Sequence, residues 1–303
     1  MEILLGLIKN VLEEGFIYGI MAMGVTVSYS ILKFPDLSVD GTFPLGACIT
    51  AVLILAGVNP WLACAAAFLC GAAAGCVTGL LHVKLRITDL LSGILVMTAM
   101  WSVNLVITGG SAVKPFYNMP TIFNSGIASM LPKGIYTYRI LIIAFVAALV
   151  VKLLLDRYLR TKSGLILQAT GDNTRFVTSL AINPGRMKIL GLAIGNGLTA
   201  LSGSILAQQG EYANISSGTG MVVMGLASVI IGTSLLKRVS FLKLTTMAVL
   251  GSIAYKACLV AAMKLGLPTN YLKLLMAVLL TVALVSNGVL KRGKEAQLDE
   301  SIG

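Results

Sequence analysis

The chain has 303 residues, of which 57% are hydrophobic and 12% are charged, whereas roughly 25% of the residues in soluble domains are charged. Its net charge is +11, but the Lys and Arg residues lie in the breaks between apolar runs and form no basic face of a soluble fold. These features predict an all-α polytopic membrane protein in contact with lipid, and they exclude nucleic acid as a partner. The single histidine and the five cysteines show no metal-ligand spacing, so we expect no metal and no cofactor in this chain.

Apolar runs follow one another along the chain, and about 20 apolar residues cross a bilayer as a helix. We expect nine spans, two of which look short and either begin inside the membrane or extend into the preceding polar residues. Residues 1–12 form an interfacial helix or part of a tenth crossing, and residues 1–303 form one transmembrane domain. The nine predicted spans are Phe16–Leu32, Phe43–Ala56, Trp61–Leu81, Leu90–Thr108, Ile140–Leu155, Ile189–Ala207, Met221–Leu236, Leu244–Met263 and Tyr271–Leu290.

The basic residues set the orientation of the spans. If the polar loop of residues 157–188 lies in the cytosol and the spans alternate, 16 of the 23 Lys and Arg residues fall on the cytosolic side. The positive-inside rule favours this orientation, with the C-terminal tail in the cytosol and, for nine spans, the N-terminus outside. The longest outer segment, residues 110–138, contains three prolines, and we expect it to form an ordered external loop that offers a surface to a partner.

A polar break precedes the second span, with the sequence FPDLSVDGT at residues 34–42. Pro35 cannot donate a helix hydrogen bond, and a broken helix is tolerated at membrane depth only where it faces protein or a water-filled cavity. One interpretation is a discontinuous helix that lines a solute path, and the other is a cytosolic loop in which Asp40 caps the next helix. On the first interpretation, the polar side chains that line the path are Asp36, Ser38, Asp40 and Thr42.

A second polar segment, NISSGT at residues 214–219, precedes the seventh span in the same way. The predicted orientation places the two segments near opposite sides of the membrane, and residues 88–91 and 270–273 form a second pair of this kind. This arrangement indicates a weak inverted repeat, which many transporters contain. The second segment adds four candidate pathway residues, which are Asn214, Ser216, Ser217 and Thr219.

Small residues recur every four positions in two spans, at residues 71, 75 and 79 and again at 191, 195, 199 and 203. Such stripes let helix backbones approach each other closely. Asn196 lies beside the second stripe, and its amide would be costly in contact with lipid. We expect Asn196 to bond a neighbouring helix, and the other interpretation places it in the solute path.

Signatures of enzymes are missing from the sequence. The chain contains no P-loop motif for nucleotide hydrolysis, and no span holds a cluster of acidic or histidine residues that would relay protons. No serine, histidine and aspartate set converges on one face by its spacing. We therefore expect a chain without catalytic activity of its own.

The loop of residues 157–188 carries Gly171-Asp172-Asn173, then Ile182-Asn183, and then Arg186 and Lys188. This order and spacing resemble the cytosolic loop of the branched-chain amino acid and sugar permeases of bacterial ABC importers. The run from Asp36 to Val39 also resembles the D-L-S-V motif of the sugar permeases. The similarity extends over about residues 12 to 290, and the pattern is closest to a subgroup linked to tryptophan or tyrosine uptake.

The resemblance implies the membrane subunit of an ATP-driven importer for a small solute, such as an amino acid, in the bacterial cytoplasmic membrane. The implied partners are two cytosolic ATPase subunits that hold ATP and Mg²⁺, a second copy of the permease chain, and an external solute-binding protein. An ion-coupled secondary transporter is the alternative, because such proteins also contain inverted repeats. That alternative needs ion-coupling groups, which the spans do not show.

The resemblance also implies that a short helix starting near Asp172 docks on the ATPase. We expect Asp172 to cap this helix and Arg175 and Phe176 to lie on its exposed side. Phe176 and Val177 replace a pair of small residues in the family pattern, and Ala181 replaces a glycine, which predicts a bulkier docking surface. The residues expected to couple the chain to the ATPase are Gly171, Asp172, Asn173, Arg175, Phe176, Ile182 and Arg186.

Overall fold

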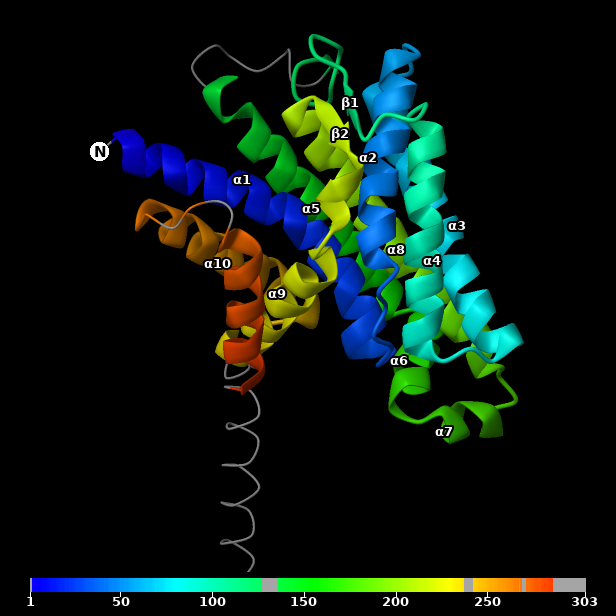
Figure 1. Cartoon of the computed structure of the whole chain (residues 1–303). Coiled ribbons are helices and arrows are strands. Elements are labelled where there is room, and N and C mark those ends of the chain that lie inside the picture. Colours follow the sequence, from blue (N-terminus) through cyan, green and yellow to red (C-terminus); the bar gives the residue numbers. More distant parts are fainter. Residues whose placement is uncertain (1, 127–135, 237–241, 267, 269–270, 286–303) are drawn as a thin grey trace, which may run out of the picture.

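The computed structural model of the protein describes residues 2–126, 136–236, 242–266, 268 and 271–285. These residues form a helical bundle with one short antiparallel sheet of two strands (Figure 1). In chain order the elements are α1 (Glu2–Val25), the π-helix η1 (Thr26–Ile31), α2 (Val39–Leu55), α3 (Pro60–Leu85), α4 (Asp89–Ile107), β1 (Val113–Pro115), the 3-10 helix η3 (Tyr136–Tyr138), α5 (Arg139–Leu159), α6 (Lys162–Asp172), α7 (Thr174–Ser179), α8 (Pro184–Gly210), β2 (Tyr212–Asn214), the 3-10 helix η4 (Ile215–Gly218), α9 (Met221–Leu236), α10 (Leu244–Lys264) and a last apolar helix, Leu272–Val285.

Among the described residues, seven helices are long and apolar enough to cross a membrane. Two shorter apolar helices, Val39–Leu55 and Leu272–Val285, coincide with the remaining two predicted spans. The prediction of an all-α polytopic membrane protein is therefore confirmed. Residues 286–290 of the last predicted span, residue 270 of the second repeat pair and the C-terminal tail lie outside the described residues.

The first span is longer than the sequence predicts, because α1 runs without a break from Glu2 into η1. Three of its charged residues have charged partners: Lys9 lies 3.6 Å from Glu13, and Glu14 pairs with Lys256 on α10. Neutralised in this way, the charges do not end the helix. From Glu2 onward, the residues before Phe16 therefore belong to the same continuous helix as the first span, and the candidate span begins at Leu5.

Local capping explains where the long helices begin and end. Asn59 accepts a hydrogen bond of 2.9 Å from the amide of Trp61, and Pro60 occupies the first turn of α3. Asn183 and Pro184 start α8 in the same way. An asparagine cap followed by proline suits this position, because it satisfies one free amide and removes another.

The core of the bundle lies along α8, against which α1, α2 and α3 pack. Glycines make this close approach possible: an added Cβ at Gly75 of α3 would overlap the Leu192 carbonyl of α8, and one at Gly46 of α2 would overlap the Ala200 carbonyl. The predicted role of the small-residue stripes in helix packing is thus confirmed for α3 and α8.

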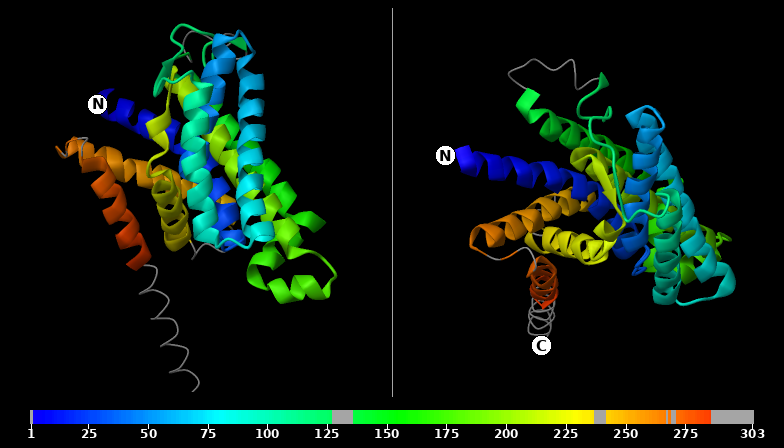
Figure 2. Two further views of the ribbon diagram at one scale, coloured as in Figure 1. Left: turned by 45° about the vertical axis from the view of Figure 1, so that its right-hand side comes forward. Right: turned by 45° about the horizontal axis from the view of Figure 1, so that its top comes forward.

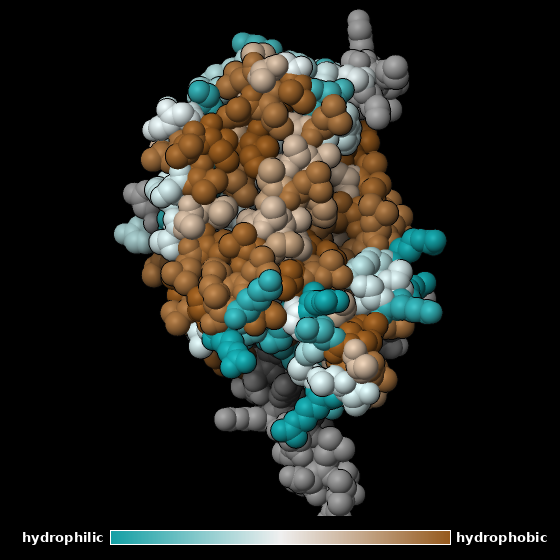
Figure 3. Space-filling model, turned by 90° about the vertical axis from the view of Figure 1, so that its right-hand side faces the viewer, coloured by the Kyte–Doolittle hydropathy of each residue, from teal (hydrophilic) through white to brown (hydrophobic). Residues whose placement is uncertain are grey.

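The surface has the apolar band of a membrane protein (Figure 3). An apolar band covers most of the face shown in Figure 3, and hydrophilic residues gather toward its lower end. At that end α6 and α7 extend beyond the membrane helices (Figure 2). At the other end β1 pairs with β2, and buried residues that include Phe116 and Ile122 anchor the described part of the external loop. Residues 127–135 lie outside the described part.

Candidate functional site

Three of the predicted pathway residues and Asn196 form one buried hydrogen-bond network where the break between η1 and α2 meets α8. The Asp36 carboxylate accepts hydrogen bonds from the amide and hydroxyl of Ser38, at 2.9 and 2.6 Å. Asn196 donates from its Nδ2 to Asp36 at 2.7 Å, and its Oδ1 accepts from Thr42 at 2.8 Å. Asp36 is 6% exposed and the other three are fully buried.

This network ties the polar break to the middle of the bundle. Asn196 is the thirteenth of the 27 residues of α8, about 18 Å from the start of that helix at 1.5 Å per residue. Buried polar groups need such partners, because an unpaired one costs about 1–3 kcal/mol. Asn196 therefore bonds the residues that precede and open α2. In this structure the four residues are packed against protein, and their place in a solute path stays a prediction.

Asp40 is not the N-cap of its own helix, which corrects the second interpretation of the 34–42 segment. Ser38 occupies the N-cap position of α2, and the Asp40 carboxylate instead accepts hydrogen bonds from the amides of Gly220 and Val222, at 3.0 and 2.7 Å. Those amides open α9, where the helix dipole favours a negative charge. The starts of α2 and α9 thus meet, and the two helices leave this point in opposite directions (Figure 1).

The second polar segment lies beside this meeting point. Asn214 caps η4 by accepting from the amide of Ser216 at 2.9 Å, and the Ser217 hydroxyl donates to the Asn214 carbonyl at 2.7 Å. Ser216 is exposed. Thr219 and Asp40 share a small pocket with Asn104 of α4. The structure therefore brings the two polar segments together but distributes their side chains over different environments.

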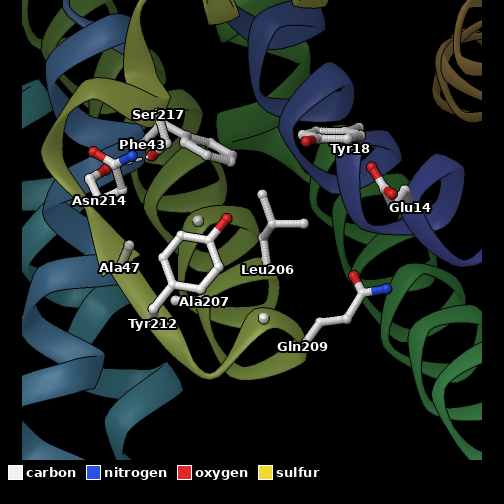
Figure 4. Close-up of a pocket in the computed structure, with 12 residues that line it drawn as sticks. Glu14, Tyr18, Phe43, Ala47, Leu206, Ala207, Gln209, Tyr212, Asn214 and Ser217 are labelled. Atoms are coloured by element: carbon white, nitrogen blue, oxygen red, sulfur yellow. Dashed lines mark hydrogen bonds between the residues drawn. The ribbon is translucent and has the colours of Figure 1, made fainter. Parts of the chain in front are cut away.

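A cavity of about 320 Å³ lies between α1, α2, α8 and the segment from β2 to η4. Two predicted residues, Asn214 and Ser217, line it (Figure 4). Sequence reasoning missed the other polar lining residues, which are Glu14, Tyr18, Gln209 and Tyr212. A carboxylate inside a span is by default a functional candidate, but this signal did not apply to Glu14, because the predicted first span begins at Phe16.

The coupling loop, residues 157–188, contains two short helices instead of one. α6 ends at Asp172, and Asn173 caps α7 by accepting from the amide of Phe176 at 3.1 Å. The expectation that Asp172 caps the docking helix is therefore wrong. Its carboxylate pairs with Lys33 at 2.8 Å, because the residue sits at the end of α6, where its side chain reaches the segment after η1.

The exposed face of α7 carries Arg175 and Phe176, as predicted, and Phe176 is 53% exposed. Val177 is 1% exposed and packs inward, so only Phe176 of this pair enlarges the surface. Ala181 has a φ of 59°, in the left-handed region that favours glycine. Because glycine adopts this φ without strain, the backbone conformation explains why the family pattern has a glycine at this position. Ile182 is half-buried and Arg186 is exposed at the start of α8.

The coupling loop contacts the end of η1 and the residues that lead from it to the polar break. An added Cβ at Gly171 would overlap the carbonyl oxygen of Ile31, the last residue of η1. Leu167 of α6 is fully buried, and it meets Leu32 beside Gly191 of α8. The exposed pair between Lys33 and Asp172 adds at most about 1 kcal/mol, so packing at Gly171 and Leu167 holds the two segments together.

Over residues 7–284 the chain matches the family described as branched-chain amino acid transport system / permease component. The chain belongs to this permease family. It is 42% identical to the tyrosine transport system permease protein of Clostridioides difficile strain R20291, over 93% of this chain and 91% of that one. An uncharacterised protein of Rickettsia prowazekii, RP368, is 30% identical over 93% of this chain and 98% of its own length. The ribose import permease protein RbsC of Escherichia coli K12 is 28% identical over 74% of this chain and 68% of its own.

The family and the fold together describe a non-catalytic, multi-pass subunit of a bacterial plasma-membrane transport system. Within the described residues, no group of three or more metal-binding side chains comes together. The interactions that the structure shows at the candidate sites are hydrogen bonds, packing and paired charges. The two candidate sites of the permease are the exposed α7 surface, on the side predicted to be cytosolic, and the cavity beside the two polar segments.

Proposed function

We propose that the permease is driven by cytosolic ATPase subunits that dock on α7 and that it imports an amino acid. The observation that carries this proposal is the exposed α7 surface of Arg175 and Phe176 in a member of this permease family. A phenylalanine side chain that is 53% exposed at a cytosolic surface suits burial by a partner. ATP and Mg²⁺ belong to that partner in this scheme, and the permease supplies the docking surface.

The packing suggests how docking reaches the membrane interior. Movement of α7 and α6 pushes on the end of η1, because Gly171 leaves no space beside Ile31. The residues after η1 lead to Asp36 and Ser38, which Asn196 holds against α8. A shift of the coupling loop therefore changes the position of the α2 start, and two packings of this break would serve as the inward-open and outward-open states.

The remaining assignments follow from the relatives. The relative in Clostridioides difficile is named for tyrosine transport, which supports an amino acid as the solute of this chain. An external solute-binding protein would deliver the solute to the side of β1 and β2. A second copy of the permease would complete the solute path as a homodimer.

An ion-coupled secondary transporter stays the alternative, and one observation favours it. Asp36 is a buried carboxylate near the middle of α8, and among the described residues it forms no ion pair. A proton or cation could load such a group. Uptake into vesicles distinguishes the two mechanisms: the ABC mechanism predicts uptake that requires internal ATP and survives collapse of the proton gradient. Uptake that follows an imposed ion gradient without ATP would establish the alternative.

Docking on α7 is tested by the double variant Arg175→Glu with Phe176→Asp. We expect the variant to insert normally and to lose the copurifying ATPase, because it reverses the charge and removes the apolar contact. The matched control is Lys162→Glu with Leu165→Asp, which makes the same kinds of change at exposed positions of α6. An ATPase that copurifies unchanged with the α7 variant, or is lost equally from both variants, contradicts docking on α7.

A further inference from the structure

The cavity between α1, α2 and α8 contains hydrogen-bond acceptors that the protein leaves available. Gln209 extends from the end of α8 toward Glu14 of α1 (Figure 4). Its Oε1 atom is buried and has no hydrogen-bond partner within the described part of the chain. Such an unpaired buried acceptor costs about 1–3 kcal/mol, which a donor from a bound molecule would recover. The cavity is thus prepared for a ligand with N–H or O–H groups.

Glu14 places a negative charge at the same wall. Its carboxylate pairs with Lys256 of α10, whose ammonium also lies 5.7 Å from the centre of the Tyr18 ring. The Lys256 side chain is 14% exposed and faces this partner, so it does not extend to the membrane surface as a lone lysine would. Only Glu14 of the pair lines the cavity. A solute in the cavity therefore meets the Glu14 carboxylate, which accepts hydrogen bonds, and not the Lys256 ammonium.

Apart from Asn214 and Ser217, the rest of the wall is apolar and aromatic. Tyr18 and Phe43 stack with ring centres 6.3 Å apart and an angle of 22° between the ring planes. Tyr212 directs its ring and hydroxyl into the cavity opposite them, and Leu206 lies between (Figure 4). Aromatic faces attract cations as well as apolar surfaces. The volume of about 320 Å³ falls at the lower end of the range for small-molecule sites.

We propose that this cavity binds an amino-acid-sized solute with a primary ammonium group and an apolar or aromatic side chain. The ammonium donates to the Glu14 carboxylate and to Oε1 of Gln209, and the side chain packs between Tyr18, Tyr212 and Leu206. This inference rests on the proposed function, since it names the group by which the imported solute is recognised. It assigns the recognition to residues of α1 and α8, outside the family motifs of the sequence.

The test is equilibrium binding to the permease–ATPase complex in lipid nanodiscs, with three labelled probes. L-tyrosine and tyramine carry the ammonium group, and 3-(4-hydroxyphenyl)propionate lacks it. We expect the first two to bind about tenfold to hundredfold more tightly than the third, as a hydrogen bond to a charged group predicts. The double variant Glu14→Gln with Lys256→Met, which leaves no buried charge unpaired, should lower tyrosine and tyramine affinity by about the same factor.

A second variant separates binding from folding. Gln209→Leu removes a buried acceptor without a protein partner, so the thermal midpoint should rise or stay the same while tyrosine affinity falls. The matched control is Glu211→Gln, which neutralises a carboxylate next to α8 but outside the cavity lining. Equal binding of all three probes, no binding of any, or wild-type affinity in both cavity variants would overturn the assignment. ATP-dependent tyrosine uptake by the wild-type complex is measured in parallel, and its absence contradicts the proposed function instead.

Discussion

Two spans of the permease, α8 and α4, show how differently apolar helices can be placed in one membrane protein. α4 is the more hydrophobic of the two, yet only 22% of its span is buried inside the protein, against 72% for α8. The large residues of α4, such as Trp101 and Val106, are 48% and 80% exposed. α8 instead buries Asn196, Thr199 and several glycines. The less hydrophobic helix therefore forms the core.

The difference in burial between α4 and α8 follows from the lipid that surrounds the protein. In lipid, large apolar side chains gain little from burial, because the hydrocarbon around them is as apolar as a protein core. Small residues gain close packing, and polar residues gain hydrogen-bond partners that lipid does not offer. Burial in this bundle is thus set by small and polar residues, and two substitutions test that rule.

The largest effect is expected for Gly75→Val on α3. The new side chain would overlap the backbone of α8 at Leu192, and the two helices would have to separate. We expect a loss of about 3 kcal/mol in the free energy of unfolding, the upper end for overpacked sites. Thermal unfolding in mild detergent, followed by circular dichroism, measures it.

The control is Ala73→Val, two residues away on the exposed face of α3. The same side chain enters lipid there, so the change in stability should stay within about 0.5 kcal/mol. Equal losses in the two variants would show that helix propensity, and not contact with α8, determines the result.

A smaller effect is expected for Asn196→Leu, which makes α8 as apolar as α4. The substitution leaves Asp36 without its donor at 2.7 Å and Thr42 without its acceptor at 2.8 Å. Stability should fall by about 2 kcal/mol in spite of the gain in hydrophobicity. Thr98→Val on α4 is the control, since that exposed hydroxyl bonds only carbonyls of its own helix. If Asn196→Leu is neutral or stabilising in the same unfolding assay, hydrophobicity decides burial after all.

The spans were predictable because each depends on local composition alone, and residues such as Phe16, Trp61 and Leu90 fall inside observed helices. The start of α1 was not predictable, because the pairing of Glu14 with Lys256 joins residues 242 positions apart in the sequence. The same limit applies to Asp40, whose partners on α9 follow it by 180 residues or more.

The two candidate sites also differ in whether a local sequence pattern could predict them. Exposure of Arg175 and Phe176 followed from one local segment, whereas the cap of α7 depended on whether Asp172 or Asn173 ends the preceding helix. The cavity was out of reach, since Glu14 and Gln209 meet only when α1 and the end of α8 pack together. Sequence patterns report on single elements, and this site is made between elements.

The smallest effect is expected outside the membrane, at Ala181 of the coupling loop. Its φ of 59° strains an alanine, so Ala181→Gly should stabilise the loop by about 0.5 kcal/mol. Hydrogen exchange of the amides from α7 to the start of α8 measures this local change, with Ala169→Gly inside α6 as the destabilising control. Faster exchange in Ala181→Gly would show that flexibility outweighs the relief of strain.

The shared start of α2 and α9 has a consequence for how the permease opens. One carboxylate, Asp40, serves both helices, because it belongs to α2 and accepts from the amides of Gly220 and Val222 that open α9. Hydrocarbon offers these groups no replacement partner, whereas water satisfies all of them. If α2 and α9 separate during transport, water or another polar partner must therefore replace these hydrogen bonds as they break. Hydration and opening would then be one event at this point, because a dry gap would leave the amides of α9 unpaired.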